Sequence, residues 1–329
     1  MQNIFVSGGA GYIGSHTVLQ LLEQGYEVTV FDNLCNASLD NINQVEQMTG
    51  KHVNFIEGDL KNFAAIDAAL ASGNYNAVIH FAALKSVIDS MSNPLDYYEN
   101  NVGGTMNLLK AMQAHDIKNI VFSSTASVYG NAKHLPINEE DPIVPDNVYG
   151  KTKAMSEKII EDMSVNGLNS VRLRYFNVAG ADISGKIGED PNAMGNLVPR
   201  IFKAMMGTYD LKIFGNQFPT RDGYQIRDYI HVVDLAAAHL SALKYFEGHT
   251  GSSVFNLGTG KGTSVIELLH EIEKATGKQI PYEVLGARAG EAFELYADAG
   301  KAKAELGWEA KSGPAEISAD AWRWYQGKI

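Results

Sequence analysis

The stretch Gly8-Gly9-Ala10-Gly11-Tyr12-Ile13-Gly14 directly follows a short apolar run, Asn3 to Val6, and opens a segment with helical periodicity. Glycines at positions 8, 11 and 14 allow a tight turn, let a phosphate approach the backbone and let the helix pack on the strand. The amino end of such a helix attracts negative charge. The stretch therefore predicts a strand, a glycine turn and a helix that together bind a dinucleotide.

The first supporting signal is Asp32, which closes the next predicted strand. A carboxylate there can accept hydrogen bonds from both hydroxyls of a ribose, and it repels a 2′-phosphate, so NAD is favoured over NADP. Asp59 follows the third predicted strand and is a candidate for hydrogen bonding to adenine. A loop or capping role for Asp59 is the alternative.

Short β-branched or aromatic runs alternate with helical periods over the first half of the chain. This alternation predicts an α/β fold with a doubly wound parallel (Rossmann) sheet, covered by helices on both faces. After residue 177 Gly, Asp, Pro and Asn become frequent, which predicts a smaller mixed α/β C-terminal domain. We expect residues 1–176 to bind NAD, with segments near 228–260 returning to that domain, and residues 177–329 to bind substrate. The predicted strands are Asn3–Val6, Val28–Phe31, Val53–Ile56, Ala77–Phe81, Ile120–Ser123 and Ser170–Phe176.

Composition excludes several classes of function. The 329 residues include 27 Lys and Arg and 38 Asp and Glu, which gives a net charge of −11. Neither a nucleic acid nor an anionic membrane is therefore an expected partner. The single cysteine, Cys35, rules out an internal disulfide, and the nine histidines show no metal-binding spacing, so no metal is predicted. No apolar run approaches the roughly 18 residues of a membrane helix. We expect a cytoplasmic protein.

A second chemical motif is Tyr149-Gly150-Lys151-Thr152-Lys153. Tyr149 and Lys153 share one face of a helix, about 5–6 Å apart at Cβ. An ammonium beside a phenol favours the phenolate and lowers a pKa that is ordinarily about 10. Tyr149 is therefore a candidate general base.

In this order GGAGYIG, the hydroxyl-rich SSTASVYG (residues 123–130) and YGKTK resemble the extended short-chain dehydrogenases/reductases. Further phrases resemble the UDP-glucose 4-epimerase family along the whole chain. These phrases are HFAALKSV (80–87), YYENNVGGT (97–105), RYFNVAGA (174–181), IFGNQFPTRDG (213–223) and RDYIHVVDLA (227–236).

The resemblance implies interconversion of UDP-glucose and UDP-galactose with a tightly held NAD. Tyr149 would take the proton of the sugar 4′-hydroxyl while C4 passes a hydride to the nicotinamide. The resulting 4-keto sugar would turn over and receive the hydride on its other face. Lys153 would hold the nicotinamide ribose and depress the pKa of Tyr149. The resemblance also implies a homodimer.

The segment SSTASVYG is informative through what it lacks. Related nucleotide-sugar dehydratases place an Asp-Glu pair after the catalytic Thr, whereas Thr125 is followed by Ala126 and Ser127. Neither side chain is a carboxylate acid or base, so 4,6-dehydration is not expected. Thr125 would hydrogen-bond O4 and relay its proton to Tyr149.

The resemblance extends residue by residue to both ligands. For the cofactor the matching positions, together with those named above, are Gly8, Gly11, Tyr12, Ile13, Gly14, Asp32, Asn33, Asn36, Asp59, Leu60, Phe81, Ala82, Lys85, Asn100, Ser123, Tyr149, Lys153 and Phe176. For the UDP-sugar they are Lys85, Thr125, Tyr149, Asn177, Asn196, Leu197, Ile213, Phe214, Arg227, Tyr229, Arg288, Glu291 and Leu295.

One position bears on the choice of sugar. In the family a residue in the segment equivalent to GEAFELYAD limits the space around the sugar 2-substituent, and Leu295 falls there unless the alignment slips to Tyr296. N-acetylated UDP-sugars therefore stay open as substrates. An epimerase for uronic acids, a nucleotide-sugar decarboxylase and a non-catalytic NAD-binding regulator also stay open as functions. The regulator is disfavoured because Tyr149 and Lys153 are both present.

Overall fold

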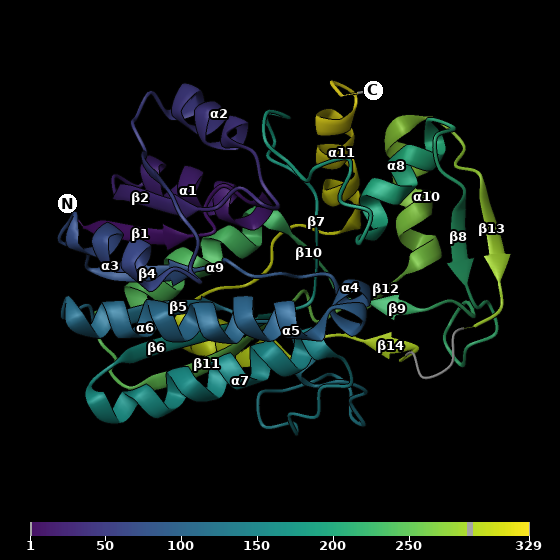
Figure 1. Cartoon of the computed structure of the whole chain (residues 1–329). Helices are drawn as coiled ribbons and strands as arrows, with labels where there is room; N and C mark the ends of the chain where they lie inside the picture. The colour runs from purple at the N-terminus through teal and green to yellow at the C-terminus, as the bar shows by residue number, and fades with distance from the viewer. Residues whose placement is uncertain (1, 288–291, 329) are drawn as a thin grey trace.

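The computed structural model describes residues 2–287 and 292–328 and places a seven-stranded sheet at the centre of the larger part (Figure 1). Every neighbouring pair in this sheet is parallel. Its strands, in spatial order, are β11 (Ser252–Leu257), β6 (Asn169–Tyr175), β5 (Asn119–Ser123), β4 (Ala77–His80), β1 (Asn3–Ser7), β2 (Glu27–Asp32) and β3 (Asn54–Glu57).

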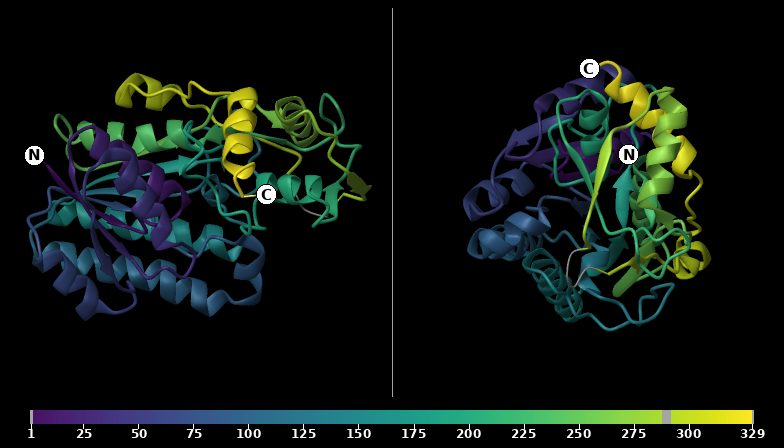
Figure 2. Two further views of the ribbon diagram at one scale, coloured as in Figure 1. Left: turned by 90° about the horizontal axis from the view of Figure 1, so that it is seen from above. Right: turned by 90° about the vertical axis from the view of Figure 1, so that its right-hand side faces the viewer.

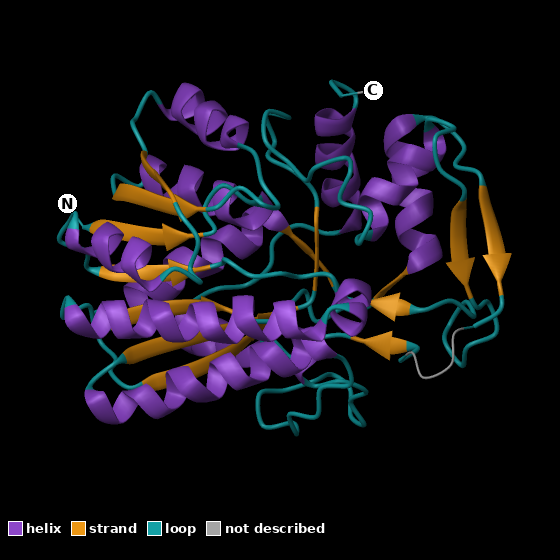
Figure 3. Cartoon of the chain, viewed as in Figure 1, coloured by secondary structure: helices purple, strands orange, loops and turns teal. Residues whose placement is uncertain are grey.

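Helices cover both faces of this sheet, as Figure 3 shows by secondary structure. Successive residues of a strand point to opposite faces, so Ile4 and Val6 of β1 pack in one buried cluster and Phe5 packs in another. The first cluster includes helices α1 (Tyr12–Glu23), α2 (Leu39–Thr49) and α9 (Val232–Tyr245). The second includes α3 (Phe63–Ala71), α6 (Gly104–Ala114) and α7 (Val148–Asp162).

A smaller part of mixed helices and strands lies beyond the carboxyl ends of the sheet strands, on the side to which their arrowheads point in Figure 1. The left view of Figure 2 shows the same arrangement from above. It has its own buried cluster, built on Phe202, Leu269 and Trp324. Its helices are α8 (Leu197–Met205), α10 (Val265–Thr276) and α11 (Pro314–Tyr325), and its strands are β7 (Asn177–Ala179), β8 (Leu211–Phe214), β9 (Ile226–Arg227), β10 (Tyr229–His231), β12 (Thr263–Ser264), β13 (Tyr282–Leu285) and β14 (Glu294–Leu295).

Two short helices, α4 (Val87–Ser92) and α5 (Pro94–Tyr97), precede α6, and irregular helical turns occupy Tyr98–Gly103, Ala126–Val128, Met163–Asn166 and Ala302–Leu306.

The predicted doubly wound parallel sheet is confirmed, and all six predicted strands are present with ends that differ by at most one residue. The seventh strand, Ser252–Leu257, comes from the region where the β–α rhythm breaks, and it pairs with β6. Helix α9 precedes it and packs on α1. The boundary near residue 176 stays a prediction.

Candidate active site

A cavity of about 990 Å³ opens at the carboxyl edge of the sheet and extends into the smaller part. Its wall takes Gly8 from the end of β1, Asp32 from β2, Phe81 after β4 and Thr125 after β5. From β1 the chain builds outward through β2 and β3, then crosses back to place β4 on the other side of β1. Parallel sheets bind ligands at the point where the strand order reverses in this way.

The glycine turn leaves room for a phosphate group. Gly8 has φ +77°, and a Cβ there would lie 2.5 Å from the Ala82 nitrogen. A Cβ on Gly14 would lie 2.3 Å from the Gly8 oxygen, so helix α1 can approach the turn only at glycine. Gly11, which also lines the cavity, caps α1 without a side-chain hydrogen bond. The free amides of the first helical turn therefore suit a pyrophosphate.

Asp32 lies beside this turn with its carboxylate held in place. One oxygen accepts from the Ala10 amide at 3.0 Å and the other from the Leu34 amide at 2.9 Å. Burial raises the Asp32 pKa, and these backbone hydrogen bonds oppose the increase. Each carboxylate oxygen keeps acceptor capacity, which fits the predicted contact with a ribose diol. The Asn33 side chain donates to Asp59 at 3.1 Å, so these two predicted cofactor contacts are bonded to each other.

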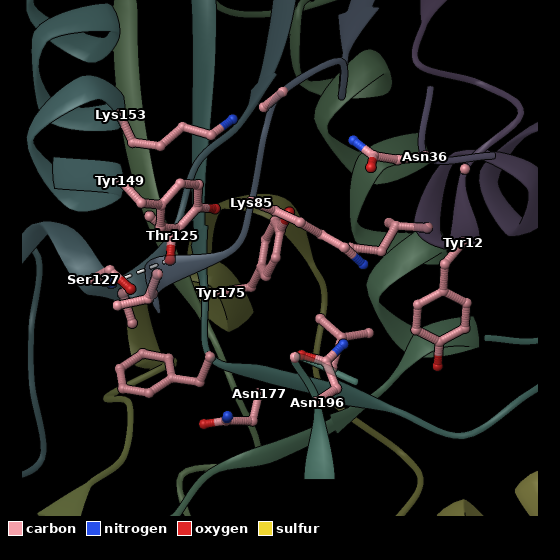
Figure 4. Close-up of a pocket in the computed structure, with 18 of the residues that line it drawn as sticks. Tyr12, Asn36, Lys85, Thr125, Ser127, Tyr149, Lys153, Tyr175, Asn177 and Asn196 are labelled. Atoms are coloured by element: carbon pink, nitrogen blue, oxygen red, sulfur yellow. Dashed lines mark hydrogen bonds between the residues drawn. The ribbon is translucent and has the colours of Figure 1, made fainter. Parts of the chain in front are cut away.

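Tyr149 lies in the first turn of α7 and is 8% exposed. Asn147 caps the helix by accepting from the Gly150 amide at 2.8 Å, which fixes where the turn begins. Burial raises the pKa of Tyr149, while a hydrogen bond with Thr125 lowers it. Figure 4 shows Tyr149, Thr125 and Tyr175 around the same space. Thr125 therefore favours the phenolate that a general base needs.

Lys153 does not have the effect on the Tyr149 pKa that the sequence predicts. Its ammonium donates to the Ser123 carbonyl at 2.8 Å and lies 4.7 Å from the centre of the Phe122 ring. Burial lowers the Lys153 pKa to about 7, and the Glu157 carboxylate opposes that decrease. The expected depression of the Tyr149 pKa by Lys153 is not met in this structure, because burial disfavours the charged form of both groups.

The hydroxyls of SSTASVYG divide into separate roles. Ser123 is buried and shares a hydrogen bond with the Tyr175 hydroxyl at 2.9 Å. Ser124 donates to the Glu157 carboxylate, and Thr125 accepts from the Ser127 amide at 3.1 Å. Thr125 is thus the hydroxyl that both lines the cavity and bonds to Tyr149.

The opposite wall comes from the smaller part of the chain. Arg227 donates to the Ile226 and Ala292 carbonyls, each at 2.8 Å, and lines the cavity together with Tyr229. Burial raises the Tyr229 pKa to about 12, and the charges of Arg227 and Arg200 oppose that increase. Two guanidinium groups near one wall suit a diphosphate.

Leu295 of β14 lines the same cavity, whereas Tyr296 is not among the described lining residues. The Tyr296 ring lies toward Gly262, where an added Cβ would be 3.3 Å from it. Tyr296 directly follows β14, and of the two residues Leu295 is the one in the cavity wall.

All predicted site residues within the described chain line the cavity, except Ser123 behind Tyr175. Arg288 and Glu291 lie outside the described residues. The sequence did not single out the lining residues Tyr175, Arg200, Lys212 and Gln225. Tyr175 stands inside the quoted phrase RYFNVAGA, but the other three carried no motif.

Within residues 2–287 and 292–328, no three His, Cys, Asp or Glu side chains group as metal ligands. None of the helices in these residues is long and apolar enough to cross a membrane.

A buried Tyr and Lys one helical turn apart, at the edge of a dinucleotide-binding sheet, place the chain among the extended short-chain dehydrogenases/reductases. The family described as GDP-mannose 4,6 dehydratase matches residues 5–320. Over 330 residues the chain is 48% identical to the UDP-glucose 4-epimerase of Bacillus subtilis (strain 168), covering 99% of this chain and 97% of the relative. The chain belongs to the UDP-glucose 4-epimerase family.

Solved structures agree with that assignment. The UDP-glucose 4-epimerase of Bifidobacterium longum, in complex with NAD+ and UDP, superposes with a TM-score of 0.94 at 42% identity, covering 99% of this chain and 98% of that one. The UDP-glucose-4-epimerase of Stenotrophomonas maltophila, with bound NAD and formylated UDP-arabinopyranose, gives 0.97 at 38% identity, covering 100% and 99%.

Proposed function

We propose that this protein interconverts UDP-glucose and UDP-galactose by inverting C4 of the sugar. The observation that carries the proposal is the Tyr149 phenol, hydrogen-bonded with Thr125, in the wall of one cavity that also contains the glycine turn and Arg227. The relatives named above carry this activity in their names.

NAD fits the cofactor end of the cavity. Gly11 and the amino end of α1 suit its pyrophosphate, and the Asp32 carboxylate suits an unphosphorylated adenosine ribose. Bound NAD supplies hydride acceptance and return at C4, together with the positive charge of its oxidised nicotinamide.

The residues of this chain supply the acid–base chemistry. Tyr149 takes the proton from the C4 hydroxyl, and Thr125 aligns that hydroxyl and stabilises the phenolate. Lys153, held at the Ser123 carbonyl, fixes the cofactor ribose on the same side. Oxidation gives a 4-keto sugar, and the proton held on Tyr149 returns to O4 when the keto sugar is reduced on its other face.

The residues after Thr125 argue against dehydration. Ala126 and Ser127 line the cavity and carry no carboxyl group. Asp146 also lines it, but this residue is exposed and accepts a hydrogen bond from Asn147 at 2.8 Å. Among the described residues that line the cavity around Thr125, none is therefore a buried acid that would help the 4-keto sugar lose water.

N-acetylated UDP-sugars are proposed as secondary substrates. Leu295, which faces the cavity, is smaller than the Tyr that excludes a 2-acetamido group in the family. Turnover of UDP-N-acetylgalactosamine by the wild type, compared with a Leu295→Tyr variant, tests the proposal. Equal turnover by both proteins would show that Leu295 does not set this limit.

We propose that two copies form a homodimer through helices α4 to α7. Exposed apolar side chains gather on these helices, namely Ile88 (71%), Leu95 (80%), Met106 (41%) and Met155 (48%). Apolar side chains of this size are unusual on a free surface when several helices that pack together carry them. Light scattering should give the mass of a dimer for the wild type and of a monomer for a Met155→Glu, Leu95→Glu variant.

We also propose a cytoplasmic location. The one cysteine, Cys35, is free in the structure, which suits a reducing compartment. Localisation of a tagged full chain by fractionation checks this.

The decisive test is incubation of the purified protein with UDP-galactose without added NAD. Formation of UDP-glucose would establish both the reaction and a resident cofactor. The Tyr149→Phe variant should keep its cofactor but lose turnover by about 10²–10⁴-fold. A protein that instead acts on UDP-uronic acids, or releases CO₂ from them, would be a uronic acid epimerase or a decarboxylase.

A further inference from the structure

Glu189 is a buried carboxyl group next to the cavity residues Asn196 and Lys85, and nothing in the sequence singled it out. It is 2% exposed and lies in the long connection from β7 to α8. Its backbone oxygen accepts from the Trp324 indole at 2.7 Å, which ties this connection to α11. The backbone at Glu189 is therefore held in place by the fold.

Two cavity residues depend on this carboxyl group. Glu189 accepts a hydrogen bond from the Asn196 side-chain amide, and Asn196 is the residue that caps α8. The Lys85 ammonium lies close enough to affect the ionisation of Glu189. Both Asn196 and Lys85 line the cavity and are labelled in Figure 4, whereas Glu189 is not among the lining residues.

We infer that Glu189 is a positioning residue that orients the Asn196 amide and the Lys85 ammonium toward the phosphates of the bound UDP-sugar. This inference rests on the proposed function. One hydrogen of the Asn196 amide is taken by Glu189, which leaves the second hydrogen and the amide oxygen for a ligand. An amide fixed in this way loses little rotational freedom on binding.

The surroundings of Glu189 make its ionisation sensitive to a bound anion. The groups that face it are Lys85, Asn196, Tyr12 from α1, Tyr325 from α11 and its neighbour Asp190. Burial raises the Glu189 pKa to about 7, while Lys85 and Asn196 oppose that increase. A diphosphate bound nearby raises the pKa further, so UDP binding near pH 7.5 should take up protons at Glu189.

The test is a double-mutant cycle on UDP affinity, measured by isothermal titration of the full chain. Glu189→Ala and Asn196→Ala should each weaken UDP binding about tenfold, and the double variant should be no weaker than about the poorer single variant. The kcat of Glu189→Ala at saturating UDP-galactose should stay within about threefold of the wild type, because KM carries the effect.

Two further variants keep the inference testable if Glu189→Ala folds poorly. Glu189→Gln has the same shape, and it should lose the proton uptake that the wild type shows when UDP is titrated in two buffers of different ionisation enthalpy. Asp190→Asn makes the same chemical change on the exposed neighbouring residue, and it should leave UDP affinity within twofold.

Additive losses in the cycle, or unchanged proton uptake in Glu189→Gln, would overturn the positioning role. Failure of the wild type itself to bind UDP would instead overturn the proposed function. Circular dichroism at the assay temperature confirms that each variant is folded.

Discussion

Replacement of Glu157 by Gln should cause a large loss of stability. Glu157 lies on α7 one turn after Lys153, and its side chain is 4% exposed. Its oxygens accept from Arg174 Nε at 3.0 and 3.1 Å and from Arg174 Nη2 at 2.6 Å, and Ser124 donates to it as well. Removing one partner of such a buried pair leaves the other charge uncompensated and costs about 3–5 kcal/mol.

The same substitution should lower activity. The Glu157 charge supports the protonated form of Lys153, so Glu157→Gln lowers the Lys153 pKa further. Ser124 also loses an anionic acceptor, and this residue directly precedes Thr125. We therefore expect a lower kcat as well as a lower free energy of unfolding. Urea unfolding followed by tryptophan fluorescence measures stability, and UDP-galactose turnover measures kcat.

Glu161→Gln is the matched control. Glu161 is on the same helix and lies 3.7 Å from Arg172, but its side chain is 46% exposed. Exposed pairs of this kind contribute about 0–1 kcal/mol. If Glu157→Gln costs no more than Glu161→Gln, the buried network does not stabilise the catalytic segment and the reasoning is refuted.

Three more predictions test the site. Gly14→Ala should lose bound NAD and lower the free energy of unfolding by about 1–3 kcal/mol, because its Cβ would lie 2.3 Å from the Gly8 oxygen. The control is Gly248→Ala, whose Cβ meets no described atom within 4 Å and which should keep its cofactor. The amount of NAD released on denaturation measures cofactor binding in both variants. Thr125→Val should lower kcat about 10²-fold, and Thr125→Ser, which keeps a hydroxyl, should lower it far less. Equal kcat values for the two variants would exclude a catalytic role for the Thr125 hydroxyl. The Lys153 pKa of about 7 lies below its ordinary value of 10.5, so the unfolded chain binds more protons between these values and stability rises with pH. In urea unfolding at several pH values, the Lys153→Met variant should lack the rise in stability that the wild type shows. The same pH dependence of stability in both proteins would contradict a lowered Lys153 pKa.

The sequence predicted those features that depend on local backbone chemistry. Gly8 and Gly14 stand where a positive φ or a close backbone approach requires glycine, and alternating apolar strands and helices indicate a parallel sheet. Tyr149 and Lys153 were found because helical spacing is regular.

The features that the sequence missed depend on tertiary packing. Glu189 bonds to Asn196 within a connection that is also tied to α11, and no regular spacing in the sequence reveals that contact. The predicted lowering of the Tyr149 pKa by Lys153 failed for a similar reason. A helix wheel shows which side chains are neighbours, but burial decides whether those neighbours carry charge.

The ionisation of Tyr149 and Lys153 connects catalysis to cofactor binding. Burial favours the neutral form of each, so a phenolate is unfavourable until positive charge enters the cavity. Oxidised NAD brings such a charge, and proton removal from the sugar is then confined to the loaded protein. Ultraviolet difference spectra should show tyrosinate at neutral pH in NAD-loaded protein, and not in protein stripped of NAD or in Tyr149→Phe. The same tyrosinate signal in stripped protein would show that Lys153 alone suffices, as the helical spacing first suggested.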